Sequence, residues 1–160
     1  MASVVLLIAG ASIHGAESVA TAHPAPDFTL RSLAGENLRL SEYRGSVVLL
    51  GFWARWCGDC RQAMQALNEV NAKYERAGLV TFGINVDDTE EQAAAMAHSL
   101  SLEFPVLLDT YKTASSRFDL KSMPLLVLID REGRIRYTHT GFERGQEIKI
   151  TEQLRQLLNE

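Results

Sequence analysis

Two cysteines, the only ones in this 160-residue chain, lie close together in the segment Trp56-Cys57-Gly58-Asp59-Cys60. They follow the apolar run Val47 to Trp53, and the residues after them have helical periodicity, which places the pair at a strand-to-helix junction. Two thiols at this spacing can close a small disulfide ring and reopen it, while the helix N-terminus stabilises a thiolate. The pattern predicts dithiol/disulfide exchange by Cys57 and Cys60.

Two other uses of a CxxC pair are weaker interpretations. A tetrahedral zinc site needs two further Cys or His ligands at regular spacing. The chain has four histidines, but they are scattered singly: His14, His23, His98 and His139. A purely structural disulfide across so short a loop would remove little chain entropy. We therefore expect no metal site, and no organic cofactor either, because no Gly-rich loop is present to cradle a phosphate.

Length and composition fit one domain with a sizeable core. Of the 160 residues, 46% are hydrophobic, which is enough to fold without additional cross-links. Sixteen basic against 20 acidic residues give a net charge of −4, so the chain has no general attraction to nucleic acid or to an anionic membrane. We expect a monomer with no nucleic-acid partner.

The first 22 residues differ from the rest of the chain. Val4 to Ala11 is apolar or small throughout, Glu17 is the only charged residue, and Ala20-Thr21-Ala22 has the small-x-small form of a signal-peptidase site. We expect residues 1–22 to be a signal or anchor segment and residues 23–160 to form a single exported, periplasmic domain. The apolar run is shorter than the ~20 residues that cross a bilayer. The alternatives are a cytoplasmic chain with an irregular N-terminus, or a short strand packing on the domain.

The remaining chain alternates strand and helix patterns. Val47 to Trp53 is apolar throughout, as expected of a central strand covered on both faces. From Asp59 to Ala77 apolar residues recur every three or four positions, and Gly78 ends the predicted helix. The other expected elements are a hairpin over 27–40, a strand over 79–86, a helix over 90–100, a strand over 104–108, a short helix over 110–118, a hairpin over 125–140 and a helix over 146–158. This order predicts an α/β fold with parallel strands around a central mixed sheet, flanked by helices, and an N-terminal β-hairpin.

These parts, in this order around the two cysteines, resemble the thioredoxin superfamily and, within it, the exported TlpA/ResA-type thiol-disulfide oxidoreductases. The resemblance extends over roughly residues 24 to 159. Its motifs are Pro-Asp-Phe-Thr-Leu at 26–30, Phe52 to Cys60, Cys60-Arg61-Gln62, Phe104-Pro105-Val106, Ser122-Met123-Pro124 and Leu128 to Gly133. It implies a thioredoxin-like fold, protein thiol or disulfide substrates, an upstream electron donor, and work as a reductant in the cell envelope, for example in cytochrome c biogenesis.

The resemblance also implies a cis peptide bond before Pro124, in a loop beside the cysteines, with Met123 facing the substrate. Cys57 lies at the helix start and is expected to be the exposed nucleophile, whereas Cys60, one turn into the helix, resolves the mixed disulfide. Trp56 is expected to offer an apolar contact face to a protein partner, and Gly58 completes the loop.

Five positions depart from the family pattern: Gln65 and Leu125 stand where the family commonly has Pro and Thr, and three others bear on the chemistry. Asp59 stands where most relatives carry Pro, and its charge repels a negative sulfur on Cys57. A less stable thiolate makes the dithiol a better electron donor, which favours a reductant. Gly51 and Ala63 stand where related proteins carry a buried acid that relays a proton to the resolving cysteine. We therefore expect slow resolution of the mixed disulfide.

Two further functions stay open. A thiol peroxidase needs a threonine one turn before the reactive cysteine and an activating arginine, a geometry that Ala54 and Trp56 do not supply. A redox-inactive or copper-carrying module of this fold would need a histidine ligand, for which only His139 comes late enough in the chain.

An acidic cluster follows the strand expected over residues 79–86. Asp87, Asp88, Glu90 and Glu91 are interpreted as a solvated face that caps the next helix rather than as a cation site.

Overall fold

Strand β4 (Val47–Trp53) lies at the centre of the sheet, and all seven of its residues are buried. The computed structural model describes residues 18–160. In it, β4 pairs in parallel with β5 (Leu79–Asn85) and antiparallel with β7 (Leu125–Ile129). The parallel pairing arises because helix α1 (Cys60–Tyr74) crosses over between β4 and β5. The predicted central strand and its mixed pairing are confirmed.

The described residues form one sheet with the strand order β1-β8-β7-β4-β5-β6-β2-β3. Its remaining strands are β1 (Ser18–Pro24), β2 (Thr29–Ser32), β3 (Asn37–Arg39), β6 (Val106–Leu108) and β8 (Arg134–Thr140). The remaining helices are α2 (Glu90–Ser99), α3 (Thr113–Arg117) and α4 (Gln146–Leu158), with short 3₁₀ turns at Leu40–Tyr43 and Glu75–Ala77. The expected N-terminal hairpin is β2–β3, and the second hairpin is β7–β8.

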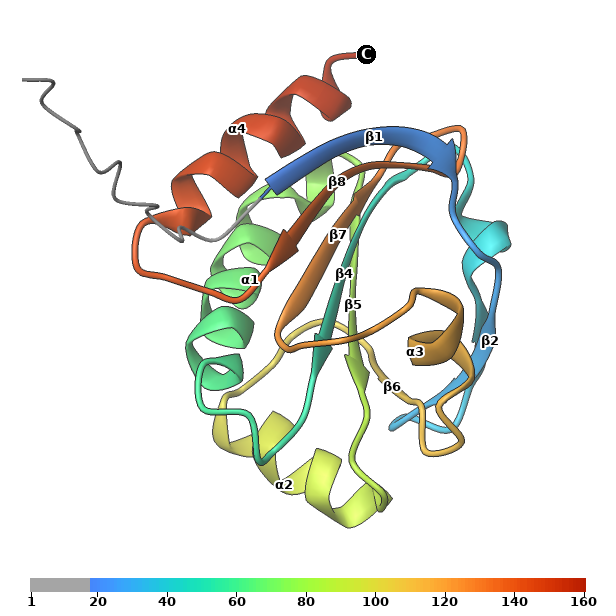
Figure 1. The fold of residues 1–160 in the computed structure, drawn as a ribbon, viewed down its shortest axis with the longest axis vertical. Coiled ribbons are helices and arrows are strands. Elements are labelled where there is room, and N and C mark those ends of the chain that lie inside the picture. The colour runs from blue at the N-terminus through green and yellow to red at the C-terminus, as the bar shows by residue number, and fades with distance from the viewer. Residues whose placement is uncertain (1–17) are drawn as a thin grey trace, which may run out of the picture.

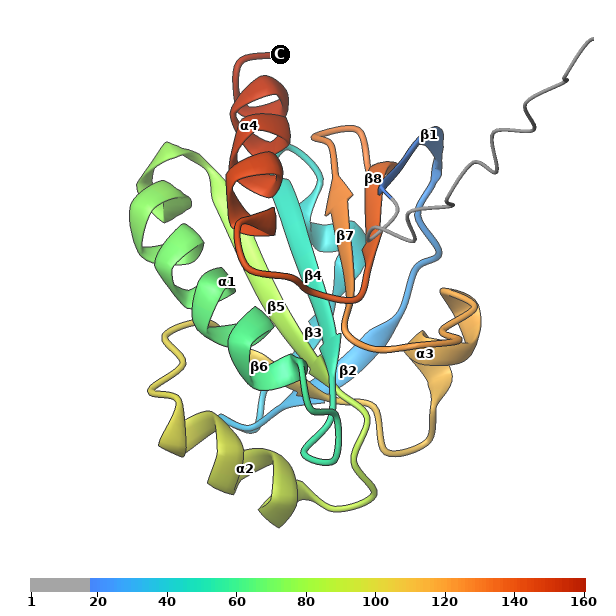
Figure 2. The ribbon, with the colours of Figure 1, turned by 60° about the vertical axis from the view of Figure 1, so that its left-hand side comes forward.

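The helices lie on both faces of the sheet, as Figures 1 and 2 show. Helices α1 and α4 cover one face, and the side chains between them and the sheet form one core cluster that includes Leu49, Trp53 and Leu154. The short helix α3 lies on the opposite face, where a second cluster includes Phe52 and Ala114. Strand β4 is apolar on both of its faces, and a central position in the sheet buries both of them.

The β1 strand begins within the segment that the sequence assigned to a signal. It pairs antiparallel with β8, from Ser18 opposite His139 to Pro24 opposite Arg134. The expected boundary between residues 22 and 23 therefore falls inside this strand. The apolar run Val4 to Ala11 lies outside the described residues. In the part of the chain from residue 18 onwards, no helix has the length and apolar character to cross a membrane.

Candidate active site

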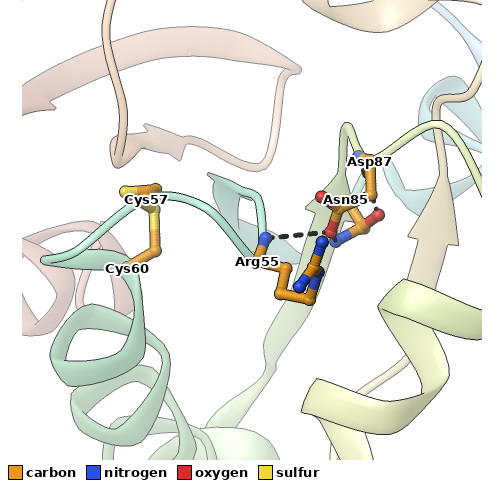
Figure 3. The surroundings of a disulfide bond; sticks show 5 residues. All are labelled: Arg55, Cys57, Cys60, Asn85 and Asp87. Atoms are coloured by element: carbon orange, nitrogen blue, oxygen red, sulfur yellow. Dashed lines mark hydrogen bonds between the residues drawn. A yellow bond between two sulfur atoms is a disulfide. The ribbon is translucent and has the colours of Figure 1, made fainter.

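The two cysteines lie where β4 ends and α1 begins. Strand β4 ends at Trp53, the loop Ala54 to Asp59 turns the chain, and α1 starts at Cys60. The backbone N–H of Cys57 donates to the carbonyl of Ala54 at 3.2 Å and so tightens this turn. Cys57 and Cys60 are joined in a disulfide bond, shown in Figure 3. The strand-to-helix junction expected from the sequence is thus the site of a closed CxxC ring.

The two sulfur-bearing residues have different surroundings. Cys60 is fully buried among Trp53, Ala63 and Met64 in the core beneath α1. Cys57 is half-buried and contacts the same cluster only from its edge. An attacking partner can therefore approach Cys57 but has no access to Cys60.

A cleft of about 600 Å³ opens beside Cys57 on the α3 side. Its apolar part includes Trp56, Val86 and Met123, and its rim includes the polar residues Lys112 and Asp119. Trp56 has 70% of its surface exposed, which is unusual for so large an apolar side chain. The cleft can therefore take an extended segment of a partner protein next to the disulfide.

The proline loop borders the same cleft. The Met123–Pro124 peptide bond is cis, as the resemblance implied. Pro124 is buried, and its carbonyl accepts the N–H of Gly141 at 2.9 Å, which ties the loop to the end of β8. Met123 is half-buried and lines the cleft. The structure thus brings this sequence-predicted pair to the cysteines.

A second hollow, of about 450 Å³, lies on the other side of Cys57, against α2. Its lining includes Arg55 and Arg61 together with Met96 of α2. Both arginines are exposed, and neither forms an ion pair with another residue in the range 18–160. Positive charge therefore lies on the α2 side of the reactive cysteine.

Asp59 directly precedes α1 and is exposed, but its side chain makes no capping hydrogen bond. It lines the same cleft as Cys57. Beneath the ring, the positions of the two missing acids are occupied by apolar packing. Ala63 is fully buried, and a Cβ placed on Gly51 would lie 2.7 Å from Leu67 Cδ2. Neither position can supply a proton to Cys60.

Asp87 corrects an expectation from the sequence. It was expected to belong to a solvated, helix-capping cluster, but it is only 2% exposed, and the cap of α2 is Thr89, whose Oγ1 accepts the N–H of Gln92. Asp87 Oδ2 instead accepts the backbone N–H of Arg55 at 2.9 Å and the Nδ2–H of Asn85 at 2.8 Å (Figure 3). The carboxylate therefore supports the chain immediately before the CxxC loop.

Sequence reasoning missed this contact, although a signal was present. Asn85 and Asp87 stand two residues apart at the carboxyl end of a buried parallel strand. Alternation along a strand puts both side chains on one face, and the carboxyl ends of β4 and β5 meet at the same edge of the sheet. Polar residues in that position are candidates for supporting a site at the end of the neighbouring strand.

The histidines of the described residues, His23, His98 and His139, do not line either hollow beside the cysteines. His139 is 1% exposed and lies between β8 and α4, with its Nε2 2.7 Å from Gln153 Oε1 and its Nδ1 3.3 Å from Gln146 Nε2. Burial lowers the pKa of His139. His98 is exposed on α2. Within residues 18–160 no group of three or more Cys, His, Asp or Glu side chains could hold a metal ion, and both ring nitrogens of His139 are already engaged.

Comparison with known proteins gives a consistent picture. Residues 21–138 match the model of the AhpC/TSA family. The chain is 32% identical over 132 residues to the thiol-disulfide oxidoreductase ResA of Geobacillus thermodenitrificans, an alignment covering 82% of this chain and 76% of that protein. It is 35% identical over 119 residues to the thioredoxin-like protein YneN of Bacillus subtilis, covering 73% of this chain and 69% of YneN.

Solved structures share the same fold. A Chlorobium tepidum protein assigned as the thiol:disulfide interchange protein DsbE superposes with a TM-score of 0.82 at 34% sequence identity, covering 86% of this chain and 96% of that one. A Bacteroides thetaiotaomicron protein assigned as a protein disulfide isomerase gives a TM-score of 0.81 at 29% identity, covering 91% of this chain and 94% of that one. The thioredoxin-like fold expected from the sequence is confirmed.

Proposed function

This chain belongs to the AhpC/TSA family and is a ResA-like thiol-disulfide oxidoreductase, and from that premise we propose that it reduces disulfide bonds of exported proteins. The observation that carries the proposal is the unequal burial of the two sulfurs beside an open cleft: Cys57 is accessible and Cys60 is not. Such an arrangement separates an attacking thiol from a resolving thiol.

The exchange then takes two steps. The Cys57 thiolate attacks one sulfur of the substrate disulfide, which forms a mixed disulfide and releases the other substrate sulfur as a thiolate. The Cys60 thiolate next attacks Cys57 Sγ, which releases the second substrate thiolate and forms the Cys57–Cys60 disulfide. Two electrons pass to the substrate, and an upstream dithiol donor must reduce the ring again.

The cleft residues have matching roles in this proposal. Trp56 and Met123 offer apolar contacts in the cleft beside Cys57, and the cis bond to Pro124 orients the Met123 backbone there. Gly58 lines the cleft, and because even a Cβ there would meet nothing within 4 Å, this position leaves the approach to Cys57 open. A partner chain lying across these residues would bring its own sulfur to Cys57.

The direction of electron flow rests on the surroundings of Cys57. Asp59 lines the cleft together with Cys57, and its negative charge disfavours the thiolate, whereas the helix N-terminus and the two arginines of the second hollow, Arg55 and Arg61, favour it. A dithiol whose thiolate is only weakly stabilised by the folded protein is a better electron donor than one whose thiolate is strongly stabilised. We therefore assign the reductant direction, with apocytochromes c or the cysteines of other exported metalloproteins as the client class.

The setting is an extracytoplasmic compartment. The support is the apolar run Val4 to Ala11 followed by the small residues Ala20 to Ala22. Cleavage after Ala22 would leave the pairs of His23 and Pro24 with β8 and remove those of residues 18–20. Sequencing the N-terminus of the protein purified from its native compartment tests this: an intact Met1 there would contradict the expected processing.

Two experiments test the function itself. Equilibration with glutathione should give a reduction potential well below about −150 mV, and a more oxidising value would reverse the assigned direction. Cys60→Ser should accumulate mixed disulfides through Cys57 with client proteins, whereas Cys57→Ser should trap none. If Cys60→Ser traps no protein in the native compartment, exchange with protein substrates is not its function.

A further inference from the structure

The carboxylate of Asp87 is buried without a cation. It is 2% exposed, and none of the basic side chains in residues 18–160 lies within ion-pair distance of it. Its partners are the backbone N–H of Arg55 at 2.9 Å and the Nδ2–H of Asn85 at 2.8 Å, both on Oδ2. Burying a carboxylate costs free energy unless it is well hydrogen-bonded. The question is therefore what these two hydrogen bonds contribute to the geometry of the site.

The backbone N–H of Arg55 lies just beyond the end of the β4–β5 ladder. The last residue pair of the β4–β5 ladder is Trp53 opposite Asn85, and the N–H of Val86 donates to the carbonyl of Trp53 at 2.9 Å. If the parallel ladder continued, its next bond would run from the Arg55 N–H to the Val86 carbonyl. That bond is absent, because the Arg55 N–H donates to Asp87 Oδ2.

The Val86 carbonyl has also found a side-chain partner. Lys112 Nζ donates to it at 2.6 Å, and Lys112 lines the cleft beside Cys57. Two side chains thus replace the two halves of one backbone hydrogen bond. The strands can separate at this point without leaving a buried N–H or carbonyl unpaired, and β4 is free to turn outward into the CxxC loop.

Asp87 itself is held in place by a reciprocal contact. Its backbone N–H donates to Asn85 Oδ1 at 3.0 Å, while Asn85 Nδ2 donates back to its carboxylate. Figure 3 shows Arg55 between this pair and the Cys57–Cys60 ring. The Arg55 N–H lies two residues before Cys57, so a fixed Arg55 fixes where the turn to Cys57 begins.

We propose that Asp87 is a positioning residue for disulfide exchange: its carboxylate takes the place of the next β4–β5 ladder bond and thereby sets the turn that presents Cys57 to the cleft. The proposal concerns the exchange reaction in either direction. Its failure is therefore distinguishable from failure of the assigned reductant role.

The test compares Asp87→Ala with Asp87→Asn. The amide oxygen of asparagine can accept the Arg55 N–H at the place of Oδ2, so Asp87→Asn keeps the geometry, whereas Asp87→Ala removes it. Asp88→Ala is the matched control, because Asp88 is next in the chain, 91% exposed, and bonded only to Lys112 in the described part of the protein. Each folded variant is assayed for the rate of reduction of a fluorescent peptide disulfide and for the pH profile of Cys57 alkylation.

We expect Asp87→Ala to slow exchange by roughly tenfold to a hundredfold and to shift the midpoint of the alkylation profile, because small misplacements of a reacting group have effects of this size. The rate of Asp87→Asn should lie within about threefold of the rate of the unmodified protein. This factor corresponds to under about 1 kcal/mol, the expected loss when a neutral amide oxygen replaces the carboxylate as acceptor. Asp88→Ala should match the unmodified protein in both measurements.

Two results would overturn the proposal. One is a folded Asp87→Ala protein with an unchanged rate and profile, which would make the contact purely structural. The other is an Asp87→Asn protein as slow as Asp87→Ala, which would assign the effect to charge rather than to the hydrogen bond. If Asp87→Ala does not fold, Asn85→Ala replaces it. That variant removes one support of Asp87 and should slow exchange measurably, and an unchanged rate would again refute the idea.

Discussion

The relative stability of the oxidised and reduced protein tests the direction of electron flow without any client. The Cys57–Cys60 ring closes across a sequence separation of 3. For a loop this short, the chain-entropy relation gives about 2 kcal/mol of stabilisation of the folded state at 25 °C. Unless the folded protein stabilises the reduced form, the oxidised protein should therefore be more stable by about 2 kcal/mol.

The same difference fixes the redox behaviour through a thermodynamic cycle. A disulfide that stabilises the fold has a lower reduction potential in the folded protein than in the unfolded chain, by about 40 mV for about 2 kcal/mol. A strong oxidant shows the opposite sign, because its folded state stabilises the reduced form, with a thiolate at the helix N-terminus. Here Asp59 opposes that thiolate, so the sign for a reductant is expected.

The measurement is guanidinium denaturation of the protein in its oxidised form and, under anaerobic conditions, in its reduced form. The oxidised form should have the higher midpoint, and its melting temperature should be higher by about 4–8 °C for a chain of this size. A protein with both Cys57→Ser and Cys60→Ser should unfold identically with and without reductant. If the reduced form proves the more stable one, the reasoning about Asp59 fails and the protein is an oxidant.

Three further perturbations have expected outcomes. Gly51→Ala should lower the free energy of unfolding by about 1–3 kcal/mol, because its Cβ would lie 2.7 Å from a core methyl. Gly58→Ala should change the free energy of unfolding by less than about 0.5 kcal/mol. Chemical denaturation of both variants checks this, and equal losses would contradict the packing argument. The pKa of His139 is lowered by burial, so its stabilising effect is complete above the unfolded value of about 6.5 and is lost as the pH falls towards the folded value. His139→Gln should therefore flatten the decline in urea midpoint between pH 7.5 and 5, and the exposed His98→Gln should leave it unchanged; the same decline in His139→Gln would refute the assignment. Trp56→Ala should raise the KM for a protein disulfide about tenfold, because the exposed Trp56 ring is available to contact a partner protein. The KM for a small disulfide such as oxidised dithiothreitol should change little. Equal effects on both substrates would argue against a docking role.

Much of the fold could be predicted because strong local patterns coincide with tertiary burial. The run Val47–Trp53 is apolar at every position, and it is the strand whose faces are both covered. The helix predicted over 146–158 has those same bounds as α4, because Gly145 and the polar residue Asn159 flank a clear apolar periodicity. The cysteine pair was equally visible, since its chemistry depends on spacing within one turn.

The features that the sequence predicted less well depend on contacts between distant parts of the chain. A short strand in the N-terminal segment stood only as an alternative, because β1 carries no strong apolar alternation, and in the structure β1 pairs with the edge of β8. Asp87 has the local sequence of a helix cap, yet its partner is the N–H of Arg55, 32 residues earlier. That partner exists only because β4 and β5 lie side by side and then diverge. Local sequence propensity cannot distinguish a helix-capping Asp from one that bonds a neighbouring strand, because the second partner becomes available only when the sheet forms.

The surroundings of Cys60 determine how its proton can leave. The residue is fully buried, and Gly51 and Ala63 occupy the two positions at which the family pattern has a proton-relaying acid. Leu67 and Met64 fill the space at Gly51, with atoms 2.7 and 2.8 Å from where a Cβ would lie. Neither position therefore provides a carboxylate, and we predict that the proton of Cys60 passes to water or to the substrate thiolate that the attack by Cys57 has released. Proton transfer to that thiolate would make the resolution step depend on the client, so we predict an exchange that is slow and differs in rate between clients.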